Sequence, residues 1–441
     1  MVENPRMPTR ILRAAGWQTA ERFAGAALLF AFMATAARTL GVGDFGRFSV
    51  GVAALILLEP LVDMGSLTAV LRLAAVQEGT AGTAARRAMC WRLGAVLAAV
   101  PVCWSIGILL PAPAPVWCGL AAALLAGHAL APAAVRLRLD LAWREIAGAR
   151  VAGRAVCAAI GSALAAARIS DPGPWLAVHA LYPLISNALA LVLARRRRPL
   201  GHGDLAPHAL RSEAWAPGLA VLLVTAYFYL DQWLVVHLLG EEPAGLYAAA
   251  VRVFSLGAQI PALTFAAAFP LLARPGKTGA EEAGRHSRNT LGTLAGWFLP
   301  LAVLAVPCAP QGLALLFGEP YAQAGTAARW LALAVCIVPF GTAATTTCMA
   351  RGIRGPLVGV LAAALVLNVA INLACLHRFG IEAAAIATCL TEAWVAVAAR
   401  RLAVSHGVDP FPTVWVRRAA IRSMVALPLG LVTAWMLEAW L

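Results

Sequence analysis

The chain alternates between long apolar stretches and short polar connections. Each stretch holds about twenty residues, which is enough for an α-helix to cross the hydrocarbon core of a bilayer. Such continuous runs exclude an outer-membrane barrel, whose strands alternate apolar and polar residues over about ten positions. The sequence therefore predicts an all-α, polytopic membrane protein with twelve core spans and a thirteenth, C-terminal span. The predicted spans are 17–38, 48–71, 90–110, 115–135, 147–168, 175–194, 216–239, 246–272, 290–310, 327–350, 356–376, 382–399 and 422–441.

The composition supports this class of protein. Of the 441 residues, 61% are hydrophobic and 13% are charged, whereas soluble domains carry about 25% charged residues. A soluble enzyme, a disordered chain and a secreted disulfide scaffold are therefore excluded. The nine cysteines follow no metal-ligand spacing and include no CxxC motif, so no metal site is predicted.

The net charge of +14 is concentrated in alternate connections between the spans. Basic connections remain cytoplasmic in membrane proteins, so we expect a cytoplasmic amino terminus. The same residues could contact anionic inner-leaflet lipids, and this distribution does not favour nucleic acid as a partner. The basic groups are Arg6, Arg10 and Arg13; Arg86 and Arg87; Arg136, Arg138 and Arg144; Arg195 to Arg198; Arg274, Lys277, Arg285 and Arg288; Arg351 and Arg354; and Arg400, Arg401, Arg417 and Arg418.

The two halves of the chain share a motif at equivalent positions. Gly41 and Gly46 in the first half correspond to Gly240 and Gly245 in the second, at a constant offset of 199 residues. Both motifs lie at the outer turn between the first two spans of their half. A parallel repeat of this kind predicts two six-helix lobes around a central cavity. The expected divisions are 1–194 for the N-terminal lobe, 195–215 for a basic cytoplasmic connection, 216–405 for the C-terminal lobe, and 406–441 for a basic segment with the extra helix.

Several short motifs resemble a known family. Arg38-Thr-Leu-Gly41, Phe45-Gly46-Arg47-Phe48 and Asp63-Met-Gly65 look like the opening of bacterial oligosaccharide (O-antigen type) flippases. These belong to the multidrug/oligosaccharidyl-lipid/polysaccharide exporter superfamily. The resemblance extends through the second half of the chain, with Asp231, Gly240, Gly245, Tyr247, Pro261, Phe269-Pro270, Leu316-Phe317-Gly318, Tyr321, Asn368, Asn372 and Phe379-Gly380-Ile381.

The resemblance implies a transporter rather than an enzyme. Its expected substrate is a polyprenyl-pyrophosphate-linked oligosaccharide, which would be flipped across the bacterial inner membrane by alternating access for surface or exopolysaccharide biosynthesis. It implies no cofactor beyond coupling to H⁺ or Na⁺, and it suggests membrane lipids, a polysaccharide polymerase and assembly proteins as partners. The alternatives are a multidrug/cation antiporter of the same fold and a membrane-embedded polysaccharide polymerase or ligase. No catalytic residue is predicted.

Two arginines within the spans are the candidate ligands for the pyrophosphate. By the same resemblance, Arg22 on the first helix and Arg252 on the eighth would hold this dianion, because a guanidinium grips phosphate oxygens in pairs. Gln259 is a candidate contact for the sugar. For Arg22 the alternative is that its side chain extends to the inner interface.

Asp231 and Arg252 lie at similar depths on adjoining helices, nine residues before Gly240 and seven after Gly245 respectively. An unpaired charge inside the membrane would be costly, so the sequence predicts a buried ion pair between them. The pair could be structural or could act as a gate, or Arg252 could contact phosphate directly.

Glu59 and Asp63 are four residues apart, so they share one face of a helix, with Pro60 between them. Two carboxylates in a low-dielectric environment favour each other's protonation, which suits proton or sodium coupling. The alternative for Asp63 is a local cap or ion pair near the inner end of its helix.

Overall fold

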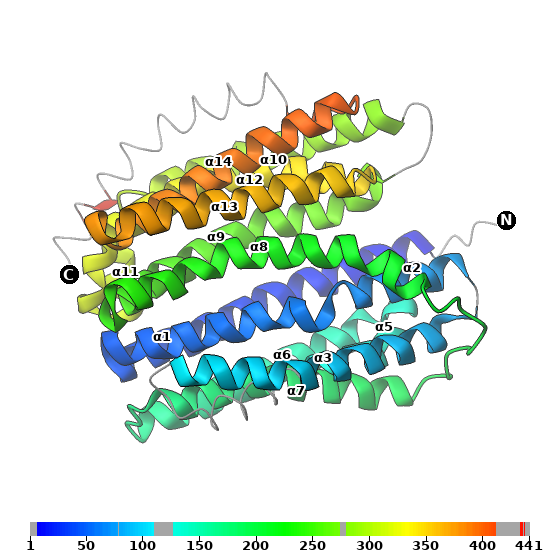
Figure 1. The fold of residues 1–441 in the computed structure, drawn as a ribbon, viewed down its shortest axis with the longest axis horizontal. Helices are drawn as coiled ribbons and strands as arrows, with labels where there is room; N and C mark the ends of the chain where they lie inside the picture. The colour runs from blue at the N-terminus through cyan, green and yellow to red at the C-terminus, as the bar shows by residue number, and fades with distance from the viewer. Residues whose placement is uncertain are drawn as a thin grey trace. The chain divides into compact units, whose positions relative to one another are not determined.

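The computed structural model describes residues 7–77, 79–109, 127–273 and 279–411, together with residues 433, 434 and 436. All regular secondary structure in these residues is helical (Figure 1). Within the described residues, eight helices are long and apolar enough to cross a membrane, or nine if the bent pair Gly279–Ala305 and Ala309–Phe317 counts as one span. The prediction of an all-α polytopic membrane protein is therefore confirmed. The spans predicted at 115–135 and 422–441 lie mostly outside the described residues.

The helices follow the predicted spans closely in the second half and more loosely in the first. Their bounds are α1 (Met7–Asp63), α2 (Ser66–Val76), α3 (Ala81–Leu109), η1 (Ala131–Ala134), α5 (Val135–Leu139), α6 (Trp143–Ala166), α7 (Pro172–Arg195), α8 (Ala209–Leu239), α9 (Glu241–Leu272), α10 (Gly279–Ala305), α11 (Ala309–Phe317), η2 (Glu319–Ala324), α12 (Gly325–Ala350), α13 (Arg354–Phe379) and α14 (Ile381–Ser405).

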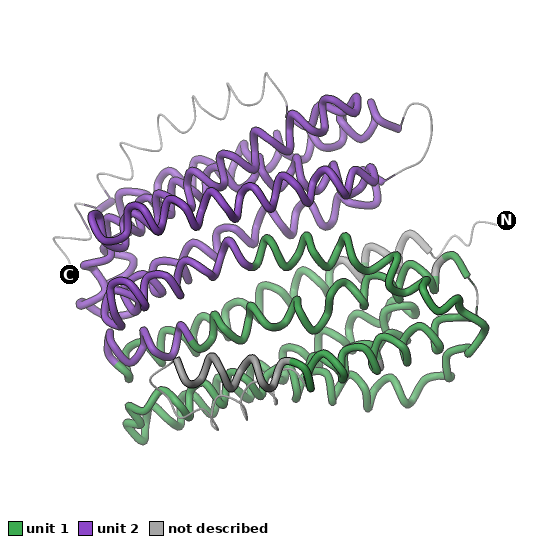
Figure 2. The backbone as a smooth tube through the Cα atoms, in the orientation of Figure 1, with its two compact units in different colours: residues 1–40, 51–225 green, residues 41–50, 226–441 purple. Residues whose placement is uncertain are grey.

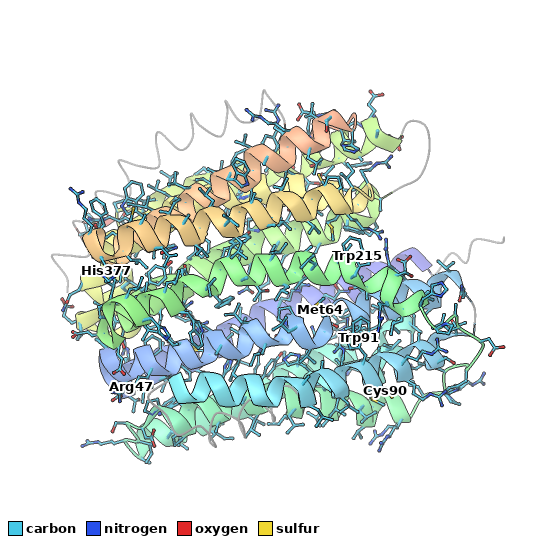
Figure 3. All side chains as sticks on the ribbon, viewed as in Figure 1. Arg47, Met64, Cys90, Trp91, Trp215 and His377 are labelled. Atoms are coloured by element: carbon cyan, nitrogen blue, oxygen red, sulfur yellow. The ribbon has the colours of Figure 1, made fainter. Side chains whose placement is uncertain are left out.

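Glycines with positive φ interrupt the first helical segment. Gly41, with φ of 76° and ψ of 174°, breaks α1 between the first two predicted spans. A second break separates α1 from α2, where Met64 (labelled in Figure 3) has φ of 40° and Gly65 has φ of 74°. The span predicted at 48–71 is therefore helical on both sides of a break at Met64 and Gly65. Glycine adopts positive φ without steric cost, so Gly65 permits this second change of direction.

The span predicted at 290–310 is also divided. Helix α10 ends at Ala305, and α11 starts at Ala309 with its axis turned by 78°. Pro310 stands in the first turn of α11, where proline is favoured because its nitrogen lacks a hydrogen to donate.

The repeat motif recurs in the backbone geometry. Gly240 has φ of 100°, so both motifs begin with a glycine in the positive-φ region. Gly46 and Gly245 pack against each other's segments. A Cβ atom added to Gly46 would lie 2.1 Å from the carbonyl oxygen of Glu241, and one added to Gly245 would lie 2.0 Å from that of Val42. Only glycine permits this backbone contact.

The chain forms two compact units (Figure 2). Unit 1 contains residues 1–40 and 51–225, and unit 2 contains residues 41–50 and 226–441. The sequence placed a separate basic connection at 195–215, whereas this segment packs within unit 1. The backbone oxygen of Gly201 accepts a hydrogen bond of 2.8 Å from Gly82, and Leu205 and Leu210 are buried in the unit's core. The boundary therefore falls later, inside α8.

Replacing Gly245 with alanine should destabilise the protein, because the new methyl group would overlap a backbone oxygen. We expect a loss of about 1–3 kcal/mol, seen as a lower melting temperature of the purified protein in detergent. Gly43→Ala is the matched control, since a Cβ there meets nothing within 4 Å. Equal melting of the two variants would contradict the close contact.

Candidate functional site

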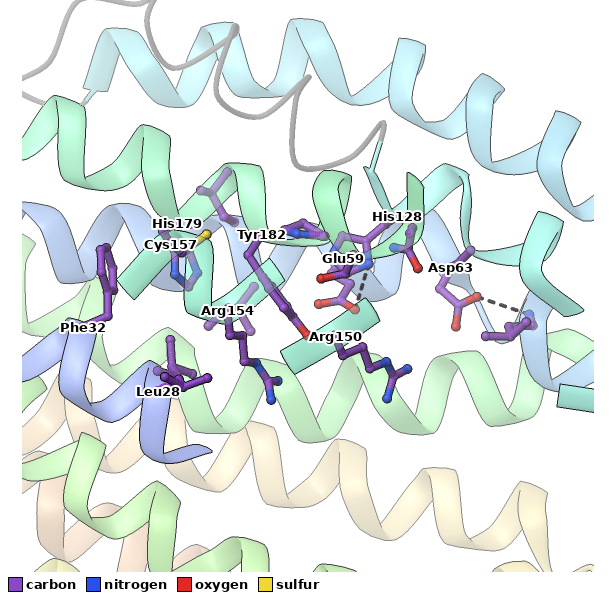
Figure 4. A pocket seen from close by; sticks show the side chains of 18 of the residues that line it. Leu28, Phe32, Glu59, Asp63, His128, Arg150, Arg154, Cys157, His179 and Tyr182 are labelled. Carbon is purple, nitrogen blue, oxygen red and sulfur yellow. Dashed lines mark hydrogen bonds and ion pairs between the residues drawn. The ribbon is translucent and has the colours of Figure 1, made fainter. Parts of the chain in front are cut away.

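Unit 1 encloses a cavity of about 400 Å³ (Figure 4). Apolar side chains such as Leu28, Phe32 and Leu55 cover part of its wall. The rest is unusually polar for a unit built from membrane-spanning helices, in which a central charge costs about 2.5–3.5 kcal/mol on insertion scales. The polar lining residues are Glu59, Asp63, Arg92, His128, Arg138, Arg150, Arg154, His179, Tyr182, Ser186 and Asn187.

Asp63 is held at the junction between α1 and α2. Its carboxylate accepts hydrogen bonds from the Ser66 hydroxyl at 3.0 Å and from the backbone N–H of Leu67 at 3.3 Å. It also forms an ion pair with Arg92 of α3. The turn at Gly65 brings the backbone N–H of Leu67, in the first turn of α2, to this carboxylate. The local role considered for Asp63 is therefore present in the structure.

Arg92 connects three parts of the wall. Its Nε donates to the Ser66 hydroxyl at 2.8 Å, and one Nη donates to the backbone oxygen of His128 at 2.7 Å. The other Nη contacts Asp63. With only 2% of its surface exposed, this arginine fixes α1, α2 and α3 against the segment that carries His128.

Glu59 lies one turn before Asp63 and also lines the cavity, as their spacing predicted. Its carboxylate is 3.1 Å from Nδ1 of His128. Histidine is the side chain whose charge ordinarily changes near neutral pH. The strength of this contact therefore depends on whether His128 carries a proton.

Arg150 and Arg154 project from successive turns of α6 and share one carboxylate. Their Nη1 atoms lie 3.4 and 3.5 Å from the two oxygens of Glu21 on α1. Glu21 is 4% exposed. The Arg154 guanidinium also stacks over the ring of Tyr182, 4.8 Å from its centroid. Figure 4 shows both arginines beside Tyr182 on one side of the cavity.

Arg138 of α5 adds a fourth guanidinium to the lining. Burial lowers the pKa of this group to about 10, and repulsion by Arg150 and Arg92 acts in the same direction; it remains protonated at neutral pH. Within the described residues Arg138 has no ion-pair partner. Four guanidiniums thus face two lining carboxylates and the neighbouring Glu21, so the site has surplus positive charge and can accept an anion.

The other predicted substrate residues lie elsewhere. Arg22 is exposed and is absent from the lining of this cavity, although its neighbour Glu21 pairs with two of the cavity's arginines. Gln259 is exposed on α9. Their roles stay predictions. Sequence reasoning missed Arg150 and Arg154, whose signal was two arginines four residues apart inside a predicted span.

The predicted ion pair between Asp231 and Arg252 is not formed. The Asp231 carboxylate instead accepts hydrogen bonds from the Tyr247 hydroxyl and, at 2.7 Å, from the backbone N–H of Gln232. Arg252 is buried, and its Nε and one Nη lack a hydrogen-bond partner within the described residues. Five residues of helix separate Tyr247 from Arg252, a rotation that leaves their side chains about 140° apart. The similar depths expected for Asp231 and Arg252 therefore did not mean that their side chains point toward each other.

Of the comparisons with known proteins, a family model shows the family and the solved structures show the fold. The family model described as "Polysaccharide biosynthesis protein" matches residues 36–325. No curated protein matches the chain. Neither this description nor the names of the similar solved structures is that of an enzyme.

Solved structures of two kinds share the fold. The lipid II flippase MurJ in an inward closed conformation has a TM-score of 0.74 at 10% identity, covering 94% of this chain and 91% of MurJ. An inward-facing multidrug resistance MATE family transporter of the MOP superfamily has a TM-score of 0.65 at 14% identity, covering 94% of this chain and 95% of that transporter. The eukaryotic MATE transporter AtDTX14 has a TM-score of 0.65 at 15% identity, covering 96% of this chain and 99% of AtDTX14.

Removing the Arg92 guanidinium should destabilise unit 1, because Asp63 would lose its ion partner. Breaking a fully buried pair costs about 3–5 kcal/mol; the Asp63 side chain is 33% exposed, so we expect about 2 kcal/mol for Arg92→Gln. Thermal unfolding in detergent measures the effect. Arg72→Gln is the control, since its pair with Glu213 is exposed and contributes less than about 1 kcal/mol. A smaller loss for Arg92→Gln than for Arg72→Gln would refute the assignment.

Proposed function

The chain belongs to the polysaccharide biosynthesis protein family, and from this premise we propose that it flips a polyprenyl-pyrophosphate-linked oligosaccharide across the bacterial inner membrane. The observation that carries the proposal is the cavity of unit 1, in which four guanidiniums outnumber the carboxylates. Substrate would enter from the cytoplasmic leaflet and leave to the outer leaflet by alternating access. The amino terminus is cytoplasmic in this scheme.

The chemistry of the cavity suits the polar part of such a lipid. The pyrophosphate carries negative charge on oxygens that guanidinium groups bind in pairs. Tyr182 and Asn187 bring a hydroxyl and an amide to the same wall, groups that can hydrogen-bond to sugar hydroxyls. The polyprenyl tail would remain in the surrounding lipid, whose hydrocarbon it matches.

The positive surplus also weighs against the alternative of a multidrug/cation antiporter, although MATE transporters share the fold. A cationic drug would be repelled by Arg138, Arg150 and Arg154. A cation pathway would instead need an excess of carboxylates. A polymerase or ligase would process the sugar after translocation and is better placed as a partner of this chain.

We further propose that Glu59 and Asp63 couple transport to H⁺ or Na⁺. Both face the cavity, and Glu59 contacts His128. The charged groups around that contact are Arg92, Asp63 and Arg150. Protonation of the Glu59–His128 pair would alter the charge of the cavity, and hence its attraction for an anionic substrate.

Transport should fail when the arginines of α6 lose their charge. We expect Arg150→Gln and Arg154→Gln each to lower flipping of the lipid-linked oligosaccharide by roughly tenfold, the effect of one lost charged hydrogen bond. The measurement is complementation of a deletion strain, with extraction of lipid-linked repeat units and quantification of surface polysaccharide. The empty deletion strain should accumulate these units on the cytoplasmic leaflet.

Arg144→Gln is the matched control for this experiment, because Arg144 is exposed on the same helix and does not line the cavity. It should complement fully at equal expression. Normal surface polymer in the deletion strain, combined with raised drug susceptibility, would replace the flippase proposal with the drug antiporter.

The pH dependence of transport should depend on the Glu59–His128 contact. In proteoliposomes, Glu59→Gln and His128→Gln should each flatten the dependence of flipping rate on pH, because each removes a group that can exchange a proton at this contact. Glu213→Gln, which removes a carboxylate outside the cavity, should retain the wild-type profile. Unchanged profiles in both cavity variants would remove this pair from coupling.

A further inference from the structure

Glu21 lies in an unusual position among the charges of unit 1. It is almost fully buried, and each of its oxygens faces a different arginine of α6, at 3.4 and 3.5 Å. Charge-assisted hydrogen bonds are ordinarily about 2.7–2.9 Å long. One carboxylate therefore contacts two guanidinium groups, each at a distance longer than a strong hydrogen bond. Each guanidinium retains N–H donors that Glu21 does not use.

Arg154 is held in place by more than Glu21. Gly25, one turn after Glu21 on α1, leaves open the space that the Arg154 guanidinium occupies, since a Cβ there would lie 1.6 Å from its Nη1. The ring of Tyr182 supports the same guanidinium from α7. Arg154 is therefore expected to keep its position when the Glu21 side chain moves away.

We propose that Glu21 is an internal substitute for the substrate's anionic group. In the empty cavity it neutralises Arg150 and Arg154, and the pyrophosphate of the lipid displaces it. This inference rests on the proposed function and adds the residue with which the substrate competes. A pyrophosphate has more oxygens and more negative charge than one carboxylate, so it can engage both arginines together with Arg138.

The competition serves two purposes. Without a ligand, two guanidiniums inside a membrane-embedded unit would lack a counter-charge, which is costly; Glu21 supplies it. When the ligand binds, the link between Glu21 of α1 and the arginines of α6 is broken. Binding therefore removes the ionic contact between α1 and α6 while the packing of Arg154 against Gly25 remains, a local change of the kind that alternating access requires.

An internal competitor lowers apparent affinity in proportion to the fraction of time for which it occupies the site. Removing its charge should therefore tighten binding. With the full-length protein in nanodiscs and geranylgeranyl pyrophosphate as the probe, we expect Glu21→Gln to lower Kd by about fivefold in isothermal titration calorimetry. Glu213→Gln, which frees the exposed Arg72 outside the cavity, should bind as wild type does.

The arginines provide the reciprocal test. Arg150→Gln/Arg154→Gln should weaken binding, and adding Glu21→Gln to this double variant should bring no gain. If Glu21→Gln binds the probe with unchanged or weaker affinity than wild type, the proposal is overturned. Should Glu21→Gln fold poorly, Glu21→Asp tests the same point, because its shorter side chain cannot reach both arginines and should also tighten binding.

Thermal stability separates this role from a purely structural one. Glu21→Gln should melt below wild type without ligand, and inorganic pyrophosphate should raise its melting temperature more than that of wild type. Equal shifts would overturn the proposal. If wild-type protein binds the probe and Glu21→Gln binds it no more tightly, the proposed competition by Glu21 is refuted but the proposed function is not. If wild-type protein neither binds the probe nor flips the lipid-linked oligosaccharide, the proposed function is refuted as well.

Discussion

A charge inside unit 1 is costly unless it finds a counter-charge or a hydrogen-bond partner, because the helices around it are built to face hydrocarbon. The architecture of the cavity follows from this constraint. Glu21 of α1 pairs with α6, and Asp63 at the end of α1 pairs with Arg92 of α3. The same pairs that hold the helices together supply the polar wall, so stability and the proposed substrate recognition depend on the same side chains. Substitutions in this wall therefore have to be assessed for both.

Hydropathy and glycine placement predicted most of the helices, the turn at Gly41 and the shared face of Glu59 and Asp63, because these are local properties of the chain. The ion pair of Glu21 with Arg150 joins residues 129 positions apart, and no local pattern reveals such a partner. Asp231 and Arg252 show the opposite case. Residue counts predict only similar depths for the two side chains. The direction of each side chain depends on helix rotation, and the Tyr247 hydroxyl bonds to the Asp231 carboxylate.

The segment 195–215 shows why a polar composition is a weak guide to a linker. Its arginines at 195–198 made it look like a solvent-exposed connection. Its backbone nevertheless bonds to the start of α3, through Gly201 and Gly82, and Thr83 and Arg87 donate to the oxygens of Gly203 and Leu205. Backbone hydrogen bonds carry no sequence signature, so only the structure reveals that this segment belongs to the packed unit.

The pairing across α1 and α6 also constrains how the protein is made. Helix α6 is among the least apolar of the candidate spans, since Arg150 and Arg154 lie within it, and each charge opposes its transfer from the translocon into lipid. Glu21 is synthesised 129 residues before Arg150, so the order of the chain supplies this counter-charge ahead of the arginines that need it. We therefore expect integration of α6 into the membrane to depend on the earlier presence of α1.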